Sequence, residues 1–306
     1  MAVAELALDP LESSDIESPL KVVAKRFIRH RLAIAGLTII AIFILAAIFA
    51  NAIAPYDPLA QNVRNTWAAP SSEHILGTDD LGRDVFSRLL YAARISLFVT
   101  IAVNLFTETT GTILGAISGY YGKWVDNVVQ RVVDVFLTLP SLPLLLFFSA
   151  ILRGIQFPGL AREWSSAVVI VIILSALGWT GATRLVRAEV LRLREQDFVQ
   201  ASKALGLSDW AIIRRHMIPN ALAPVIVNAT LGLGTIIIVE AALSFLGFGI
   251  QPPIPTWGNM LQGVQQRMFL NPWLAFYPGL CIFLVALSFN YVGDALRDAL
   301  DPRLKH

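Results

Sequence analysis

Residues 32–54 read LAIAGLTIIAIFILAAIFANAIA, a run without a single charged side chain. An α-helix needs about 20 apolar residues to cross the hydrocarbon core of a bilayer, so this run is long enough. The basic stretch KVVAKRFIRHR precedes it, and residues 1–20 contain acids but no lysine or arginine. A cleaved signal peptide would be shorter and nearer the N-terminus. The sequence therefore predicts a disordered acidic tail followed by a retained membrane helix.

The composition of the whole chain also indicates a membrane protein. Of its 306 residues, 56% are hydrophobic and only 15% are charged, whereas a soluble domain is about one quarter charged. The mean hydropathy is +0.64. The single cysteine, Cys281, excludes a disulfide framework within the chain. The four histidines lack the spacing of metal ligands, so no metal site is predicted.

Five further apolar runs follow, at residues 95–119, 132–152, 165–183, 221–250 and 274–293. Lipid offers the backbone no hydrogen-bond partners, so each run is expected to form an α-helix. The predicted fold class is therefore all-α: a polytopic membrane protein with six transmembrane helices.

The distribution of lysine and arginine predicts the orientation, because these residues are enriched on the cytoplasmic side of a membrane. With the N-terminus inside, 17 of the 24 lysines and arginines lie in cytoplasmic segments and seven lie outside. Both termini are therefore expected in the cytoplasm. The predicted segments are a cytoplasmic stretch 1–31, a first helix 32–54, an extracytoplasmic stretch 55–94, a five-helix core 95–293 with a cytoplasmic loop 188–220, and a cytoplasmic tail 294–306.

Glycines and prolines in these spans predict how the helices pack and bend. Gly111, Gly115 and Gly119 recur every four residues, which lets a neighbouring backbone approach closely, either within the chain or at a subunit contact. Pro140 and Pro143 are expected to kink or break the third span. Such a break either lines a transport pathway or is a plain structural kink.

Two acids, Glu108 and Glu240, interrupt predicted spans. A charge at this depth is costly, so both are candidates for residues of a translocation path. The alternatives are that each faces a wet cavity, pairs with a donor, or is protonated.

The extracytoplasmic stretch contains SEHILGTDDLGRDVFSRLLYAAR at residues 72–94. An apolar stripe runs from Asp80 to Arg94 at helical spacing, which predicts an interfacial or pore-mouth helix. Gly77 and Gly82 are expected to interrupt it.

Residues 195–220, EQDFVQASKALGLSDWAIIRRHMIPN, predict two short helices in the cytoplasmic loop. No proline or glycine occurs between 190 and 205, so a helix is expected there, ending at Gly206. Ser208 is placed to cap a second helix that starts at Asp209 and ends at Pro219. One face of that second helix is expected to hold Trp210, Ile213 and Met217.

Two short helices joined at a glycine are also typical of helix-turn-helix proteins that bind DNA. Here hydrocarbon lies about fifteen residues from each end of the motif, and no soluble dimerising domain accompanies it. These residues therefore indicate no nucleic-acid partner. A docking element for a cytoplasmic protein fits this context.

The same residues carry a family resemblance. QASKALG followed by the IP of RRHMIPN resembles the EAA signature of ABC importer permeases, with matches at Ala201, Gly206 and Pro219. The departures are Gln200 for the usual glutamate, Ser202 for the second alanine, and Ile218 for leucine.

Further segments resemble the C-type permease of the dipeptide, oligopeptide and nickel importers, over nearly the whole chain. They are HILGTDDLGRDVFSRLLYAARISL, LTLPSLPLLL, ALSFLGFGIQPPIPTWGNML and FNYVGDALRDALDP.

The resemblance implies a type I ABC importer permease in a bacterial inner membrane. Its implied partners are a homologous B-type permease, two cytoplasmic ATPases, an extracytoplasmic substrate-binding protein and membrane lipid. GYYGK, residues 119–123, lacks the spacing of a Walker A loop, so ATP and magnesium would be bound by the ATPases and no cofactor by this chain. The residues implied in ATPase coupling are Gln200, Ala201, Ser202, Leu205, Gly206, Leu207, Asp209, Trp210, Arg214 and Pro219.

Two other classes of protein remain as alternatives. An ion- or proton-coupled carrier would use Glu108 and Glu240 but would need no docking loop at 184–220. A membrane enzyme would need a nucleophile with a nearby base, and no such pair is evident, so no catalytic residue is expected. The substrate stays open among dipeptides, longer peptides, nickel chelates, glutathione-like molecules and other small solutes.

Overall fold

The computed structural model describes residues 19–265 and 267–300, and the regular structure in these two ranges is helical. One isolated β-bridge joins Thr78 and Asp84. The predicted tail, up to residue 18, and the last six residues lie outside the described residues. In order, the elements are α1 (Pro19–Arg29), α2 (Arg31–Ile48), α3 (Ala50–Ile53), α4 (Val85–Tyr121), α5 (Lys123–Thr138), α6 (Ser141–Leu152), α7 (Arg162–Arg194), α8 (Asp197–Ala204), α9 (Asp209–Ile212), the π-helical turn η1 (Ile213–Met217), α10 (Ile218–Phe245), α11 (Trp257–Val264) and α12 (Pro272–Leu300).

Five helical stretches in the described residues are long and apolar enough to cross a membrane. They are α2, α4, α7, the continuous stretch from α9 to α10, and α12. The pair α5 and α6, bent by 90°, makes a sixth if it counts as one broken span. The all-α membrane class is therefore confirmed, and the six predicted spans correspond to five helices and this bent pair.

The bent pair departs most from a simple span. The break falls at Leu139 and Pro140, as predicted, and Pro140 caps the N-terminus of α6. Pro143 causes no further bend, because it lies in the first turn of α6, where a backbone N–H has no helical partner to lose. The predicted span 132–152 starts too late, since α5 already begins at Lys123.

The N-terminal end of α4 differs from the sequence expectation. The predicted interfacial helix from Asp80 to Arg94 is wrong as a separate element, because one helix of 37 residues runs from Val85 through the membrane span. Its start is fixed by Asp84, whose side chain accepts a hydrogen bond from the Ser87 N–H. Gly77 and Gly82 do interrupt the chain, but in the loop before this helix, where both have positive φ.

Predicted boundaries also move at the last two spans. α10 ends at Phe245 rather than near 250, because Gly247 turns the chain with a φ of +83°. α12 continues to Leu300, past the predicted end at 293. The residues assigned to a C-terminal tail thus begin as helix.

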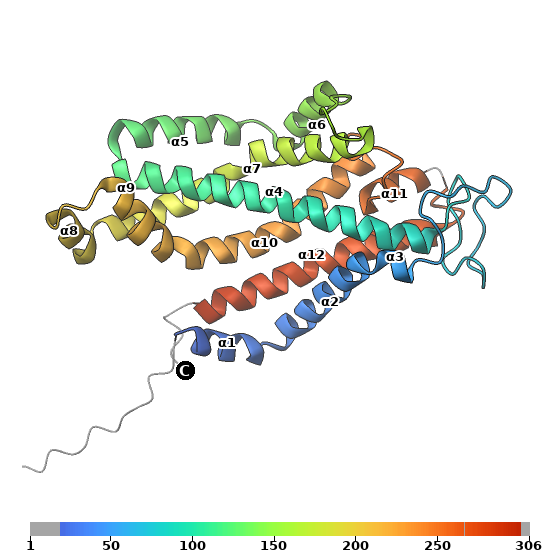
Figure 1. The fold of residues 1–306 in the computed structure, drawn as a ribbon, viewed down its shortest axis with the longest axis horizontal. Coiled ribbons are helices and arrows are strands. Elements are labelled where there is room, and N and C mark those ends of the chain that lie inside the picture. The colour runs from blue at the N-terminus through green and yellow to red at the C-terminus, as the bar shows by residue number, and fades with distance from the viewer. Residues whose placement is uncertain (1–18, 266, 301–306) are drawn as a thin grey trace, which may run out of the picture.

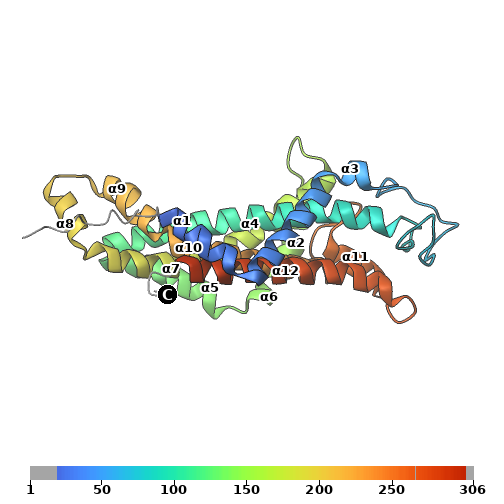
Figure 2. The ribbon, with the colours of Figure 1, turned by 90° about the horizontal axis from the view of Figure 1, so that it is seen from below.

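The long helices lie side by side along the long axis of the molecule (Figures 1 and 2). α3, the loop before α4, and α11 gather at one end, and α8 and α9 project at the other (Figure 1). Three buried apolar clusters follow the same axis. One lies under α11 around Trp257, one lies between α4 and α7 in the middle, and one joins the ends of α4 and α7 to α8 and α9.

The predicted glycine stripe lies at a close helix contact, between α4 and α7. A Cβ atom on Gly115 would lie 2.5 Å from the Thr183 carbonyl oxygen, and one on Gly119 would lie 2.9 Å from that of Arg187. Gly111 meets the same helix one turn earlier, at Ala182. The stripe therefore brings two backbones of the same chain together.

We expect Gly115→Ala to lower the free energy of unfolding by about 1–3 kcal/mol, because the added methyl group overpacks this contact. The measurement is thermal unfolding of the protein in detergent. Gly181→Ala is the matched control: Gly181 lies on α7 with nothing within 4 Å of a Cβ position. That substitution should leave stability unchanged or raise it by up to about 1 kcal/mol through helix propensity. Equal effects at both glycines would contradict this account of the contact.

Candidate functional site

The segment between α7 and α10 forms a short helical hairpin at one end of the bundle (Figures 1 and 2). The predicted single helix over 190–205 is wrong, because α7 ends at Arg194 and α8 starts at Asp197. Gln196 between them is extended. The break turns α8 so that Val199 is fully buried against the ends of α4 and α7. Burial thus overrides a local preference for continuous helix.

Gly206 ends α8, as predicted. Its φ is +78°, the Leu207 N–H donates to the Ser202 carbonyl, and the Gly206 N–H donates to the Lys203 carbonyl. This pair of bonds is the Schellman motif, which favours glycine at the left-handed position. No atom lies within 4 Å of where a Cβ of Gly206 would be.

The second helix starts as predicted and ends differently. The Ser208 hydroxyl accepts a hydrogen bond from the Ala211 N–H and caps α9. Pro219 does not stop the helix, however, because the chain passes through η1 straight into α10. In η1 the Ile218 N–H reaches back five residues to the Ile213 carbonyl, and this wider turn accommodates a proline at the start of α10.

The three side chains predicted for one face of the second helix have different surroundings in the structure. Ile213 and Met217 are fully buried, whereas Trp210 is 54% exposed, so the predicted common face is wrong. Leu205 is 80% exposed and Phe198 is 39% exposed. We call Phe198, Leu205 and Trp210 the exposed apolar tip.

Polar contacts hold the hairpin and the end of α7 to α4. The Tyr120 hydroxyl donates to Asp209 Oδ1 over 2.8 Å, and the Lys203 ammonium lies 5.3 Å from the centre of the Tyr120 ring. The Arg194 guanidinium donates to the carbonyls of Gly119 and Tyr120 at the end of α4, at 3.4 Å each. Sequence reasoning missed Tyr120 and Arg194, because their partners are far away in the chain.

The remaining predicted coupling residues divide between surface and core. Gln200, Ala201 and Arg214 are exposed. The side-chain amide of Gln200 donates a hydrogen bond to the Arg194 carbonyl. Ser202 is buried and donates to the Phe198 carbonyl, and Leu207 packs partly into the core.

A second polar group connects α5 to this end of the bundle. Arg187 binds both carboxylate oxygens of Asp126, at 2.5 and 2.6 Å, and Asp126 also accepts from the Ser118 hydroxyl. Arg184 pairs with Asp134 further along α5. In the sequence these arginines signalled only orientation, whereas here they join α7 to α5.

The intramembrane acid Glu108 lies between α4 and α10. Its Oε1 atom accepts a hydrogen bond of 2.6 Å from the Asn228 amide. Its Oε2 atom is buried without a hydrogen-bond partner among the described residues, as is Oδ1 of Asn104 one turn earlier. The side chain as a whole is partly exposed.

The second acid, Glu240, has no exposed area. The Ser244 hydroxyl on the same helix donates to its Oε1 atom over 2.8 Å, and the hydroxyls of Ser96 and Thr256 also face the carboxyl group. These contacts join α10 to α4 and to the segment before α11. The carboxyl group of Glu240 is thus enclosed by its own chain: its Oε1 atom is paired with a donor, and its Oε2 atom is buried without a hydrogen-bond partner among the described residues.

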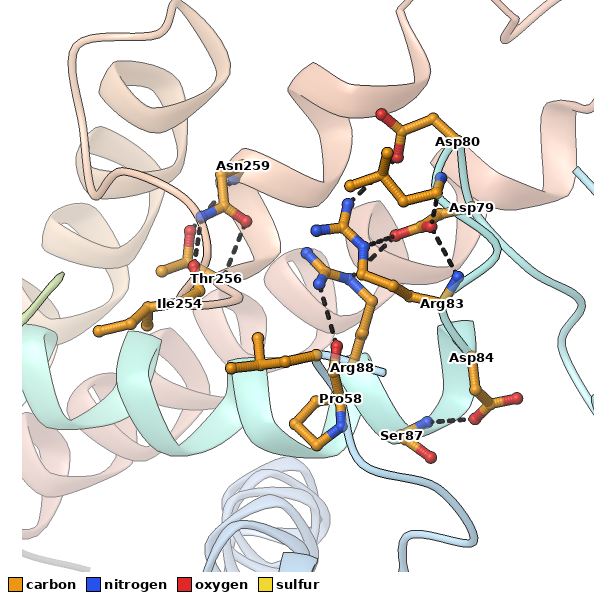
Figure 3. A network of polar contacts seen from close by, with 12 residues as sticks. Pro58, Asp79, Asp80, Arg83, Asp84, Ser87, Arg88, Ile254, Thr256 and Asn259 are labelled. Atoms are coloured by element: carbon orange, nitrogen blue, oxygen red, sulfur yellow. Dashed lines mark hydrogen bonds and ion pairs between the residues drawn. The ribbon is translucent and has the colours of Figure 1, made fainter. Parts of the chain in front are cut away.

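At the opposite end, a polar network fixes the start of α4 (Figure 3). Asp79 accepts hydrogen bonds from the Arg83 side chain and from two backbone N–H groups, and Arg88 lies 3.2 Å from the same carboxylate. The Arg88 guanidinium donates to the Pro58 carbonyl. Thr256 and Asn259 cap α11 beside this network.

Comparison with known proteins identifies a family. The model of binding-protein-dependent transport system inner membrane components matches residues 111–306. The N-terminal transmembrane domain of oligopeptide transport permease C matches residues 18–70.

Similar proteins of known name cover almost the whole chain. It is 43% identical to the dipeptide transport system permease protein of Alkalihalophilus pseudofirmus, over 94% of this chain and 91% of the relative. The oligopeptide transport system permease protein of Bacillus subtilis is 38% identical, over 92% of this chain and 88% of the relative. The glutathione transport system permease protein of Pectobacterium atrosepticum is 38% identical, over 97% of this chain and 96% of the relative.

Two solved structures share the fold. An amino acid ABC transporter and the methionine ABC transporter in an inward-facing conformation both match with a TM-score of 0.51 over 71% of this chain. The matched regions make up 94% of the amino acid transporter chain and 98% of the methionine transporter chain, at 16% and 19% sequence identity. The chain thus has the fold of an ABC transporter permease.

We expect Tyr120→Phe to loosen the hairpin, because it removes the hydroxyl that donates to Asp209. Local opening of α8 and α9 should become easier by about 1 kcal/mol, seen as faster amide hydrogen exchange over residues 197–212. Tyr121→Phe is the matched control, since the next side chain along α4 is 45% exposed. Unchanged exchange in the Tyr120 variant would show that this bond does not hold the hairpin.

Proposed function

Because this chain belongs to the family of binding-protein-dependent transport system inner membrane components, we propose that it is one of two permease subunits of an ATP-driven peptide importer. The family consists of membrane transporter subunits rather than enzymes. Relatives that cover most of the chain are named for the transport of dipeptides, oligopeptides and glutathione. The substrate is therefore a short peptide or a peptide-like solute.

The exposed apolar tip is the observation that carries the coupling role in this proposal. Leu205 and Trp210 are largely exposed on a hairpin that is otherwise tied into the core. Apolar side chains presented on a fixed hairpin at the surface suit burial in a groove of another protein. That protein is one of two cytoplasmic ATPases, which bind ATP and magnesium.

The contacts behind the tip would carry its movement into the bundle. Val199 and Ile212 of the hairpin pack against Val186 and Val190 of α7 and against Tyr120 of α4. When the ATPases close on ATP, a displaced hairpin would pull on the ends of α4, α7 and α10. The segment implied by the family resemblance, from Gln200 to Pro219, is thus the coupling element.

The orientation follows from the basic residues. α1 and the hairpin lie toward the same end of the molecule (Figure 1), and the residues in and around both are rich in lysine and arginine. We place this end, with both termini, in the cytoplasm of a bacterial cell, and the chain in the inner membrane. α11 and the loop that precedes α4 then face the extracytoplasmic binding protein. A homologous B-type permease completes the translocation path.

The test is purification of the chain after co-expression with a B-type permease and two ATPases, followed by uptake of a labelled dipeptide into proteoliposomes. ATP-dependent uptake that requires the binding protein supports the proposal. Transport by this chain alone, without ATPases, would show that it is an ion-coupled carrier instead.

We expect Gly206→Val to reduce both peptide uptake and the stimulation of ATPase activity at least tenfold. A β-branched residue at φ +78° costs about 1–3 kcal/mol and should unwind the turn that positions the tip. Gly206→Asn is the control, because asparagine adopts this conformation more readily and the position is open. Membrane insertion should be the same in both variants. Normal uptake in the valine variant would exclude the bend from the coupling mechanism.

A further inference from the structure

A cavity of about 370 Å³ opens between α6, α7 and the loop that follows α10. Its walls come from the end of α6 and the residues after it, from the first turns of α7, and from residues 248–253. α6 and the junction between α10 and α11 lie away from the hairpin of α8 and α9, toward the other end of the molecule (Figure 1). Pockets that hold small organic ligands measure roughly 300–1,000 Å³. The cavity is therefore large enough for a small solute.

An arginine, Arg153, lines this cavity and is held in place by a neutral partner. Its Nη2 atom donates to Gln251 Oε1 over 2.6 Å. The Gln251 Nε2 atom in turn donates to the carbonyls of Gly247 and Gly249, at 3.2 and 2.8 Å. These bonds fix the amide so that its oxygen faces the guanidinium. Arg153 is thus positioned without its charge being neutralised.

The charge on Arg153 has no acidic partner in the described part of the chain. No described carboxylate lies within ion-pair distance of the guanidinium, and none of the described lining residues is acidic. The side chain is exposed, so a solute can reach it from outside. Besides the N–H bound to Gln251, the guanidinium keeps further donors in a planar fork that matches a carboxylate. The charge in the cavity therefore favours a ligand with a carboxylate group.

Part of the lining is apolar. Leu152, Val169, Ile170 and Phe248 contribute to it, and Val169 and Ile170 are almost completely buried. An inorganic anion would leave these side chains against water, whereas a ligand with an apolar group next to its carboxylate would cover them. The C-terminal residue of a peptide combines the two groups.

We propose that this cavity binds the C-terminal residue of a peptide before it enters the membrane-spanning part of the path. This proposal rests on the proposed function as a peptide importer and on its orientation, which puts the cavity on the extracytoplasmic side. The α-carboxylate binds Arg153, and the last side chain packs against Val169 and Ile170. Gln251 acts as a positioning residue, because it orients the guanidinium without competing for its charge.

An acidic side chain of the binding protein is the other carboxylate that can reach this face of the molecule. Such a side chain would pair with Arg153, but it is too small to fill a cavity of about 370 Å³ or to cover its apolar wall. The shape of the cavity thus favours a whole residue with a free carboxylate, and docking of the binding protein becomes an outcome of the test.

The first test uses the complete importer in proteoliposomes, with a labelled dipeptide and its C-terminal amide. We expect Arg153→Met to reduce kcat/KM for the free dipeptide about 10- to 100-fold, the size of losing a charge-assisted hydrogen bond. The amide should lose less than about threefold. The binding protein contributes equally to the wild type and the variant, so its own preference cancels when the two are compared for each peptide. Arg153→Lys should recover part of the loss, since it keeps the charge but not the fork.

The matched control is Arg64→Met, which removes an exposed arginine from the loop before α4, outside the cavity. It should change kcat/KM for either peptide less than about twofold. An equal loss for both peptides in Arg153→Met would show that the arginine serves structure or docking of the binding protein rather than the peptide carboxylate, and would overturn the proposal.

A second measurement detects binding without the binding protein. Gln156, an exposed residue of the lining, is replaced by cysteine in a Cys281→Ala background, and labelling by a membrane-impermeant maleimide is followed in the purified complex. The free dipeptide should slow labelling, and the dipeptide amide should not. Ser72→Cys, in the exposed loop before α4, should be labelled at the same rate with and without dipeptide. Protection of Gln156→Cys by both peptides or by neither would overturn the proposal, as would protection by the empty binding protein alone.

The two proposals fail differently. Absence of ATP-dependent peptide uptake in the wild type would refute the importer. Normal wild-type uptake, with unchanged kcat/KM for the free dipeptide in Arg153→Met, would refute the carboxylate site alone.

Discussion

The close approach of α4 and α7 is the contact on which the rest of the molecule depends. In lipid, apolar side chains gain little by leaving their surroundings, so helices associate through close packing and polar contacts. Gly111, Gly115 and Gly119 remove side chains from the seam and bring the α4 backbone onto α7. That approach places Arg187 and Arg194 beside the end of α4, where they bind Asp126 and two helix carbonyls.

α4 also connects regions that have different roles. Its first turn is fixed by Asp84 and Arg88 in the outer polar network (Figure 3), and its last turn holds the coupling hairpin through Tyr120. Glu108 lies between these ends. A continuous helix of 37 residues is about 55 Å long and stiff, so displacement of one end is felt along its length. The coupling hairpin and the outer polar network are thus attached to one rigid element.

Two prolines show how the same residue type has different effects in different surroundings. Pro140 follows an extended Leu139, and the chain there turns by 90° between α5 and α6. Pro219 follows a π turn, whose wider hydrogen bonding accommodates the proline ring, so the helix continues into α10. The sequence rule that proline ends a helix is correct for the first and wrong for the second, because the turn before Pro219 is shaped by the burial of Ile213 and Met217.

The sequence by itself determined the features that depend on nearby residues or on the solvent. Long uncharged runs predicted membrane helices, the glycine spacing predicted a close contact, and Gly206 and Ser208 marked the turn between α8 and α9. The motif around Gly206, together with segments elsewhere in the chain, indicated the family. The proposed roles of Glu108 and of the coupling residues stay predictions, since they concern partners and substrate that lie outside this chain.

Only the tertiary structure decided which distant groups meet. It separated Glu240, fully enclosed beside Ser244, from Glu108, which is partly exposed and accepts a hydrogen bond from Asn228 on α10. It also showed that Tyr120 holds Asp209 across 89 positions of sequence. Helix boundaries moved for the same reason: α7 breaks after Arg194 so that Val199 can be buried, and no local pattern of residues contains that contact.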